Sequence, residues 1–409
     1  MKVPRIKGVI LSVEDVILPM GESDDVALFE EIEKLINFFK SREIIFTILA
    51  NRSFRIGEDP LEDRLKEHWG DFPYFCTSKD HSIPKKPLAA STAYVLEQLG
   101  WRQEEVVYIG ASDSDMKTAV NGKLLFLRAT WWNTKTDYGF EFDSPKDIAR
   151  YIDTFCLREH HWCHEIHDQD FHFYALAPFS TFREEHTLYS ADARSTAKNG
   201  KGHPDFWVGA LVSSIYFSGL YKEINYITSY PGHRPGSGNS VMDEAVAIFG
   251  KCFRINYIPD LIIRHTQATK SQTARRTGIT IGHENQLNTI FINPTPRKNS
   301  KSCYSSSPLR KGKCVLVIDD FCTRGYSLES ARAYLRRTGV KVITASWLKT
   351  INSDIETLAN LGRFDPYQPN TFEDITLGKK YLYRDNIVDI HAPDELTKQF
   401  KGYEGWDWS

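Results

Sequence analysis

The sequence predicts an α/β protein that contains two doubly wound parallel-sheet domains. The chain has 409 residues, of which 41% are hydrophobic, and this is enough for two or three domains with cores of their own. Short apolar runs rich in Val and Ile alternate with helical segments over residues 1–150, and a second series of such runs lies between residues 224 and 347. This alternation is typical of parallel sheets covered by helices.

The first series predicts four strands in a compact domain that covers residues 1–150. The strands are expected at Gly8–Ser12, Ile44–Ala50, Val106–Gly110 and Leu124–Arg128. Residues 151–180 are rich in His and are interpreted as a linker. Residues 181–409 then form the second domain with a C-terminal extension.

The second series predicts five strands. They are expected at Ile224–Thr228, Leu261–Ile263, Thr289–Ile292, Val315–Ile318 and Lys341–Trp347. The segment Pro294–Lys313 is rich in Ser, Pro, Lys and Arg without periodicity, which predicts a loop that moves. The aromatic end, Tyr403–Ser409, is expected to pack on the domain or to mediate assembly, and on this basis a homodimer is expected.

Composition limits the class of protein. A formal net charge of −2 argues against a surface dominated by nucleic-acid binding. No stretch approaches the roughly 20 apolar residues of a membrane helix, so we expect a soluble, cytoplasmic protein. The seven cysteines are scattered without the spacing of a disulfide framework, and we expect reduced thiols.

The segment from Val315 to Ser327, VLVIDDFCTRGYS, carries the clearest functional signal. Its apolar run predicts a buried strand that ends at Asp319 and Asp320, where ligands of α/β sheets bind. Adjacent carboxylates accept hydrogen bonds from ribose hydroxyls or support a hydrated Mg²⁺. The following turn offers hydroxyls and permissive backbone, and a helix expected at Leu328–Arg336 directs its N-terminus to the same place, which suits a phosphate. The alternative is an ordinary strand-to-helix turn capped by Thr and Ser.

This segment resembles the phosphoribosyl-pyrophosphate loop of type I phosphoribosyltransferases, and the chain looks closest to the competence-protein-F type. The resemblance implies Mg²⁺ as cofactor, phosphoribosyl pyrophosphate or a nucleotide as ligand, and transfer or cleavage of a phosphoribosyl group. It implies catalytic roles and magnesium binding for Asp319 and Asp320. Phosphoribosyl-phosphate binding falls to Thr323, Arg324, Gly325, Tyr326 and Ser327. Arg324 and Phe321 are bulkier than is usual in such loops and are expected to reshape the entrance.

Two looser matches extend the resemblance. ITSYPGHRPGS, from Ile227 to Ser237, stands where the family has its pyrophosphate loop, and it assigns pyrophosphate binding to Ser229, Tyr230, Pro231, Gly232, His233 and Arg234. The turn Ser229–Gly232 is expected to offer backbone N–H groups, and His233 and Arg234 to add charge. A mobile basic loop that closes over the reaction is assigned Arg264, Lys270, Arg275 and Arg276. The alternative for this basic run is a solvated loop or a phosphate-backbone contact.

Residues 1–150 resemble capless members of the haloacid-dehalogenase-like hydrolases, through KKP and VVYIGASDSDMKTA. The family's nucleophilic and acid aspartates are here Ser12 and Glu14, its Thr or Ser corresponds to Asn51, and Ala111 replaces a metal-binding acid. Lys86 and Asp115 are retained. Because attack on phosphorus needs a nucleophile beside Mg²⁺, we expect a degenerate, inactive phosphatase site.

The segment from Cys156 to Phe173 concentrates histidines. If it were helical, His160, His164 and His167 would share one face, as in a zinc site. The preferred alternative is a charged linker helix that packs Trp162 and Ile166 inward.

Three functions remain open from the sequence. The first is a phosphoribosyltransferase with a pseudo-phosphatase domain. The second is a nucleotide-sensing regulatory protein, with a protein partner on the open face of the first domain. Fusions of such domains resemble proteins of bacterial stress-response and phage-defence operons. An active phosphatase is the third alternative.

Overall fold

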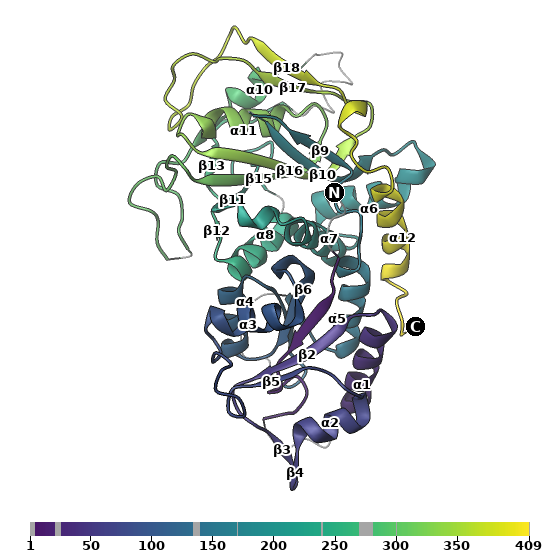
Figure 1. Cartoon of the computed structure of the whole chain (residues 1–409). Coiled ribbons are helices and arrows are strands. Elements are labelled where there is room, and N and C mark those ends of the chain that lie inside the picture. The colour runs from purple at the N-terminus through teal and green to yellow at the C-terminus, as the bar shows by residue number, and fades with distance from the viewer. Residues whose placement is uncertain are drawn as a thin grey trace.

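The computed structural model contains two six-stranded α/β sheets stacked end to end (Figure 1). It describes residues 5–20, 26–133, 140–169, 171–238, 240–269, 281–299 and 301–408. The predicted α/β class with parallel sheets is confirmed. Across the described ranges, no helix combines the length and apolar character needed to cross a membrane.

The first sheet is parallel throughout. Its order is β5 (Tyr74–Cys76), β2 (Ile45–Ala50), β1 (Gly8–Leu11), β6 (Val106–Gly110), β7 (Leu125–Ala129) and β8 (Phe140–Phe142). Its helices are α1 (Val26–Ser41), α2 (Leu61–Trp69), α3 (Ala89–Leu99), α4 (Asp113–Gly122) and α5 (Pro145–Tyr151). The helices α1 and α5 pack together, as do α3 and α4, and the two pairs lie on opposite sides of the sheet (Figure 1). The four predicted strands are present, and β5 and β8 are additional.

The second sheet is parallel except at one edge. Its order is β12 (Asn256–Tyr257), β11 (Tyr226–Ser229), β15 (Cys314–Cys322), β16 (Lys341–Thr350), β10 (His172–Phe179) and β9 (His164–His167), with β9 antiparallel. Alternate residues of β15 enter two hydrophobic clusters, Leu316 and Ile318 on one face and Val315 and Val317 on the other. Both faces are therefore buried, which explains the continuous apolar run.

Helices on both faces bury this sheet and join it to the first. They are α6 (Glu184–Asn199), α7 (Pro204–Phe217), α8 (Ser240–Phe253), α11 (Tyr326–Arg336) and α12 (Ala392–Tyr403). The helix α11 packs on β15 and β16, while α7 and α8 lie between the two sheets, with α8 against α4 (Figure 1). The hydroxyl of Tyr216 on α7 donates to the carbonyl of Val106 at 2.6 Å. A single hydrophobic cluster runs through this junction.

Short elements complete the fold. A two-stranded antiparallel sheet joins β13 (Ile262–Arg264) and β14 (Ile290–Ile292), beside the short helix α10 (Glu284–Leu287). Two hairpins pair β17 (Ile355–Leu358) with β18 (Leu377–Tyr381) and β3 (Arg55–Ile56) with β4 (Asp59–Pro60). The strands predicted near 261 and 289 thus pair with each other and do not extend the second sheet.

In its described residues, the His-rich segment Cys156–Phe173 does not form the helix that both of its interpretations require. A π-helical turn, Ile152–Cys156, is followed by irregular chain and then by β9 and β10, so the predicted linker supplies two strands of the second sheet. Trp162 and Ile166 are buried as expected. The shared helical face proposed for His160, His164 and His167 is absent, because His164 and His167 lie in a strand.

The C-terminal end returns to the first sheet. The indole of Trp406 donates to Asp153 at 2.8 Å, and that of Trp408 donates to Glu31 at 3.2 Å. Trp406 also contacts the ring of Phe38 on α1. These aromatic residues pack within the chain, so they no longer support the expected homodimer.

Candidate functional site

The predicted ligand-binding segments of the second sheet meet at the carboxyl ends of β11 and β15. The two strands are parallel neighbours, and the N–H of Tyr230, just after β11, donates to the carbonyl of Ile318 at 2.8 Å. The turn that follows β11 therefore lies beside Asp319. This common edge is where open α/β sheets bind their ligands.

Asp319 and Asp320 lie within β15, which continues to Cys322. The prediction that the strand ends at these acids was therefore wrong. Asp319 pairs with Ser346 of β16 in the sheet register, and this pairing holds the acids in place. Among the residues that the structure describes, no Lys or Arg forms an ion pair with either carboxyl group. Within the described ranges, their carboxyl groups accept backbone hydrogen bonds only from Asp320 N, which donates to Asp319 at 2.9 Å, and from Phe321 N, which donates to Asp320 at 2.8 Å.

Both carboxyl groups have a raised pKa. Burial, followed by the negative charge of Asp320, raises the pKa of Asp319 well above its usual range. Burial also raises the pKa of Asp320, although a hydrogen bond with the carboxyl group of Asp319 and the charge of Lys198 on α6 oppose this. A cation or a set of hydroxyl donors would stabilise the ionised form.

Lys349 fixes the turn after β15, and this role was not predicted from the sequence. Its ammonium group donates to the carbonyl of Thr323 at 2.5 Å and to the hydroxyl of Ser353 at 2.8 Å. The side chain is 2% exposed, and burial lowers its pKa. The strand predicted to end at Trp347 extends to Thr350 and therefore includes Lys349. A lysine at the end of an apolar strand is the sequence feature that could have indicated its supporting role.

The turn leads directly into α11. Gly325 adopts a φ of 78°, and a Cβ atom there would approach Ile355 to 2.8 Å, so glycine is required for both reasons. The helix begins at Tyr326, which places Ser327 in the first turn, where free N–H groups favour anions. Arg324 is exposed and donates to the hydroxyl of Tyr326 at 3.4 Å. Phe321 packs on Phe179 of β10, with ring centroids 4.8 Å apart.

The turn after β11 differs from expectation in its donors. The N–H of Tyr230 is used by Ile318, that of Gly232 donates to Ser237 at 2.8 Å, and Pro231 has none. The hydroxyl of Ser229 donates to Asp243 at 2.6 Å. The expected backbone donors of Tyr230 and Gly232 are therefore satisfied within the protein, and the exposed side chain of Arg234 is the charged group of this turn that can face an anion.

Arg264 fixes this turn and does not belong to a mobile loop. It is the last residue of β13 and is 4% exposed. Its guanidinium donates to the carbonyl of Gly232, to Gln286 at 2.9 Å and to the hydroxyl of Tyr230 at 3.2 Å. A planar fork with several acceptors suits this supporting role. The other members of the proposed basic loop, Lys270, Arg275 and Arg276, lie outside the described residues.

The residues of the site predicted in the first sheet bind one another. The ammonium of Lys86 donates to Asp115 at 2.7 Å, Ser12 at 3.2 Å and Tyr108 at 3.3 Å. Asp115 also accepts hydrogen bonds from the N–H and hydroxyl of Ser112 at 3.1 and 2.8 Å. Although burial alone would raise the pKa of Asp115, the charge of Lys86 and these hydrogen bonds lower it.

The remaining predicted residues frame this network. The side chain of Asn51 accepts a hydrogen bond from Lys86 N at 2.8 Å and donates to Lys86 O at 3.1 Å, which fixes the backbone at this lysine. Glu14 forms an ion pair with Arg52 at 2.7 Å. With Ser12 and Ala111 in place of acids, no described carboxylate here is left to bind a metal beside Asp115.

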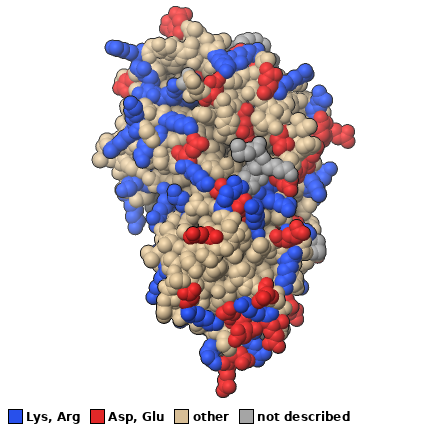
Figure 2. Space-filling view, in the orientation of Figure 1, with Lys and Arg blue, Asp and Glu red and all other residues tan. Residues whose placement is uncertain are grey.

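Charge is distributed unevenly over the surface. Figure 2 shows Lys and Arg side chains spread over the end of the molecule that holds the second sheet, whereas Asp and Glu gather at the opposite end, near β3 and β4. The second sheet is therefore the better place for an anionic ligand.

Comparisons with known proteins concern about a third of the chain. No family model and no curated protein matches the sequence. A hydrolase of the haloacid dehalogenase superfamily from Geobacter sulfurreducens is 14% identical and covers 35% of this chain and 97% of that chain, with a TM-score of 0.26. One from Ehrlichia chaffeensis is 15% identical and covers 37% and 97%, with a TM-score of 0.27.

A further similar structure is a protein assigned as a phosphoglycolate phosphatase from Lactobacillus delbrueckii. It is 21% identical, with a TM-score of 0.26; the match covers 30% of this chain and spans about half, 53%, of that protein.

Proposed function

We propose that the protein is a phosphoribosyltransferase that uses phosphoribosyl pyrophosphate and Mg²⁺, with its reaction centre at Asp319–Ser327. The observation that carries this proposal is the pair of acids in β15, which form no ion pair with a Lys or Arg among the described residues and lie beside a turn and a helix N-terminus. The substrate class is a nucleobase or a nucleotide-like molecule.

Each segment has a role in this proposal. Asp319 and Asp320 accept hydrogen bonds from the two ribose hydroxyls. The hydroxyls of Thr323 and Ser327, with the first N–H groups of α11, hold the 5-phosphate. Arg234 offsets charge on the departing pyrophosphate.

The residues present fit a magnesium ion. The described residues contain no group of three or more His, Cys, Asp or Glu side chains placed to hold a metal. Mg²⁺ is commonly bound by one or two carboxylates, with water and substrate phosphates as the other ligands, so Asp319 and Asp320 would suffice. The ion would neutralise charge on the pyrophosphate.

The phosphatase alternative has less support. Lys86 and Asp115 neutralise each other, and the hydroxyl of Ser12 accepts a hydrogen bond from Lys86. Neither Lys86 nor Asp115 is therefore placed to activate a nucleophile.

The test is release of pyrophosphate from phosphoribosyl pyrophosphate with MgCl₂ and a panel of nucleobases, with products identified by mass spectrometry. We expect turnover by the wild type and at least a hundredfold loss in Asp319→Asn with Asp320→Asn, because removing charge-assisted contacts at a reaction centre has effects on the order of 10² or more. Glu373 and Asp374 are exposed acids that also follow each other in the sequence, so Glu373→Gln with Asp374→Asn is the matched control and should retain activity. Nucleotide binding without release of pyrophosphate by the wild type would replace this proposal with the regulatory one.

A further inference from the structure

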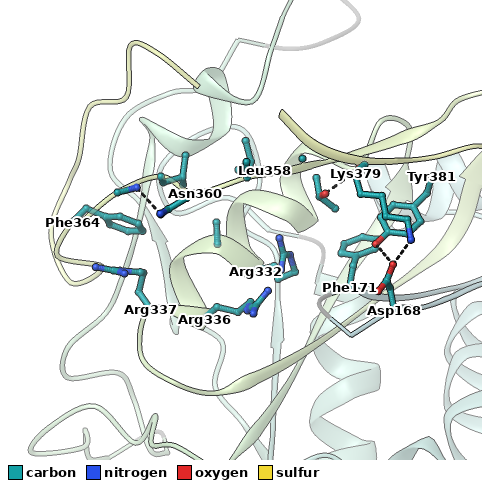
Figure 3. A pocket seen from close by; sticks show the side chains of 16 residues that line it. Asp168, Phe171, Arg332, Arg336, Arg337, Leu358, Asn360, Phe364, Lys379 and Tyr381 are labelled. Carbon is teal, nitrogen blue, oxygen red and sulfur yellow. Dashed lines mark hydrogen bonds and ion pairs between the residues drawn. The ribbon is translucent and has the colours of Figure 1, made fainter. Parts of the chain in front are cut away.

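A cavity lies beside α11, away from the candidate site at Asp319–Ser327. Its volume is about 570 Å³, and it is enclosed by α11, the β17–β18 hairpin, the chain at 359–364 and the turn between β9 and β10 (Figure 3). None of its 16 lining residues belongs to the site at Asp319–Ser327. Cavities of roughly 300–1,000 Å³ accommodate small organic ligands.

The lining is cationic. Arg332, Arg336, Arg337 and Lys379 line the cavity, against the single carboxylate of Asp168. Arg332 is bound to the buried Glu329 by two hydrogen bonds of 2.6 Å, and Lys379 lies 2.5 Å from Asp168. The exposed Arg336 is the last residue of α11 and the exposed Arg337 follows it, and both line the cavity on the Phe364 side of Arg332 (Figure 3).

Aromatic rings form two of the walls. Phe171 and Tyr381 stack at one end, with centroids 5.4 Å apart and planes 28° from parallel. At the other end the guanidinium of Arg337 lies over Phe364, 5.3 Å from the ring centroid (Figure 3). The planar ring of a ligand could stack on aromatic side chains at either end of the cavity. An anionic group of the same ligand could bind the guanidinium groups that lie between the two ends.

A structural role accounts for only part of this arrangement. Arginines in the last turn of a helix favour the negative end of its dipole, which explains Arg336 and Arg337 without a ligand. It does not explain why the same residues line a cavity with an excess of positive charge and aromatic walls.

We propose that this cavity is a second binding site, which takes a small phosphorylated molecule with a planar ring, of the nucleoside monophosphate class. Arg336 and Arg337 bind the phosphate, and Phe364 or the Phe171–Tyr381 pair stacks on the ring. The inference does not depend on the proposed transferase reaction, because the two sites share no lining residue.

The test is calorimetric titration of the full chain with adenosine monophosphate, guanosine monophosphate and inorganic phosphate. We expect a saturable nucleotide site that is weakened about tenfold or more in Arg336→Gln with Arg337→Gln, since a charge-assisted contact contributes about a factor of ten. The control, Lys398→Gln with Lys401→Gln on the exposed face of α12, removes the same charge and should bind as the wild type does. Arg332 is left intact because its loss would strand Glu329 in the core.

Two further variants make the outcome decisive. Ala359→Trp fills the cavity without changing charge and should also abolish binding, even if the arginine variant is less stable in thermal unfolding. Asp319→Asn with Asp320→Asn should retain binding in this cavity. The proposal is overturned if the wild type binds neither nucleotide at millimolar concentration, if binding survives both cavity variants, or if it is lost only in the aspartate variant.

Discussion

Asp115 is buried and Asp319 is half-buried, each near the carboxyl end of a parallel strand, yet their pKa values move in opposite directions. Lys86 and Ser112 surround Asp115 with donors and hold its pKa low. Asp319 has a second acid beside it, and its pKa is raised. A buried charge that is neutralised within the protein has no need of a ligand, whereas one that is not can gain stability by binding one. The comparison explains why we place the reaction centre in the second sheet.

Breaking the compensated network should produce the largest effect on stability. Lys86→Met leaves Asp115 buried without its cation, and we expect the free energy of unfolding to fall by about 3 to 5 kcal/mol. Urea denaturation measures this change. The neighbouring Lys85 is exposed, so Lys85→Met is the matched control and should change stability by less than about 0.5 kcal/mol. Equal effects of the two substitutions would show that the Lys86 network is not a buried ion pair.

The uncompensated pair should give a smaller effect that depends on pH. Because the folded pKa of Asp319 is raised, the folded state holds more protons than the unfolded state, so stability falls as pH rises above the usual aspartate range. Asp319→Asn with Asp320→Asn removes this penalty and should therefore raise the free energy of unfolding at pH 8 above that of the wild type.

Asp115 gives the opposite sign: its lowered pKa stabilises the folded state above the usual aspartate range, and this contribution is lost as pH falls through the lowered value. Thermal unfolding between pH 5 and pH 8 measures the effect for Asp319 and Asp320. Parallel profiles for the wild type and the aspartate variant would contradict it.

The sequence predicted the strands whose apolar runs are buried on both faces, such as β1, β6 and β15, because that burial requires continuous Val and Ile. It did not predict β10, whose run contains Pro178 and follows a cluster of histidines, or β9, in which His164 is buried. Tertiary contacts decide such strands.

The site shows the same division. Asp319 to Ser327 are contiguous, so their proximity followed from the sequence. Lys349 binds Thr323, 26 residues away in the sequence, and Arg264 binds Gly232, 32 residues away. The N–H of Gly232 is used within the protein because the turn closes on the carbonyl of Ser237. Periodicity and motif spacing carry no information on such contacts.

The central claim is that Asp319 and Asp320 bind a sugar phosphate and that the Lys86–Asp115 network does not. Calorimetric titration of phosphoribosyl pyrophosphate with MgCl₂ into the full chain tests it most directly. We predict saturable binding to the wild type and to Glu373→Gln with Asp374→Asn, and none to Asp319→Asn with Asp320→Asn. Binding of equal strength to the aspartate variant, or no binding to the wild type, would contradict the claim.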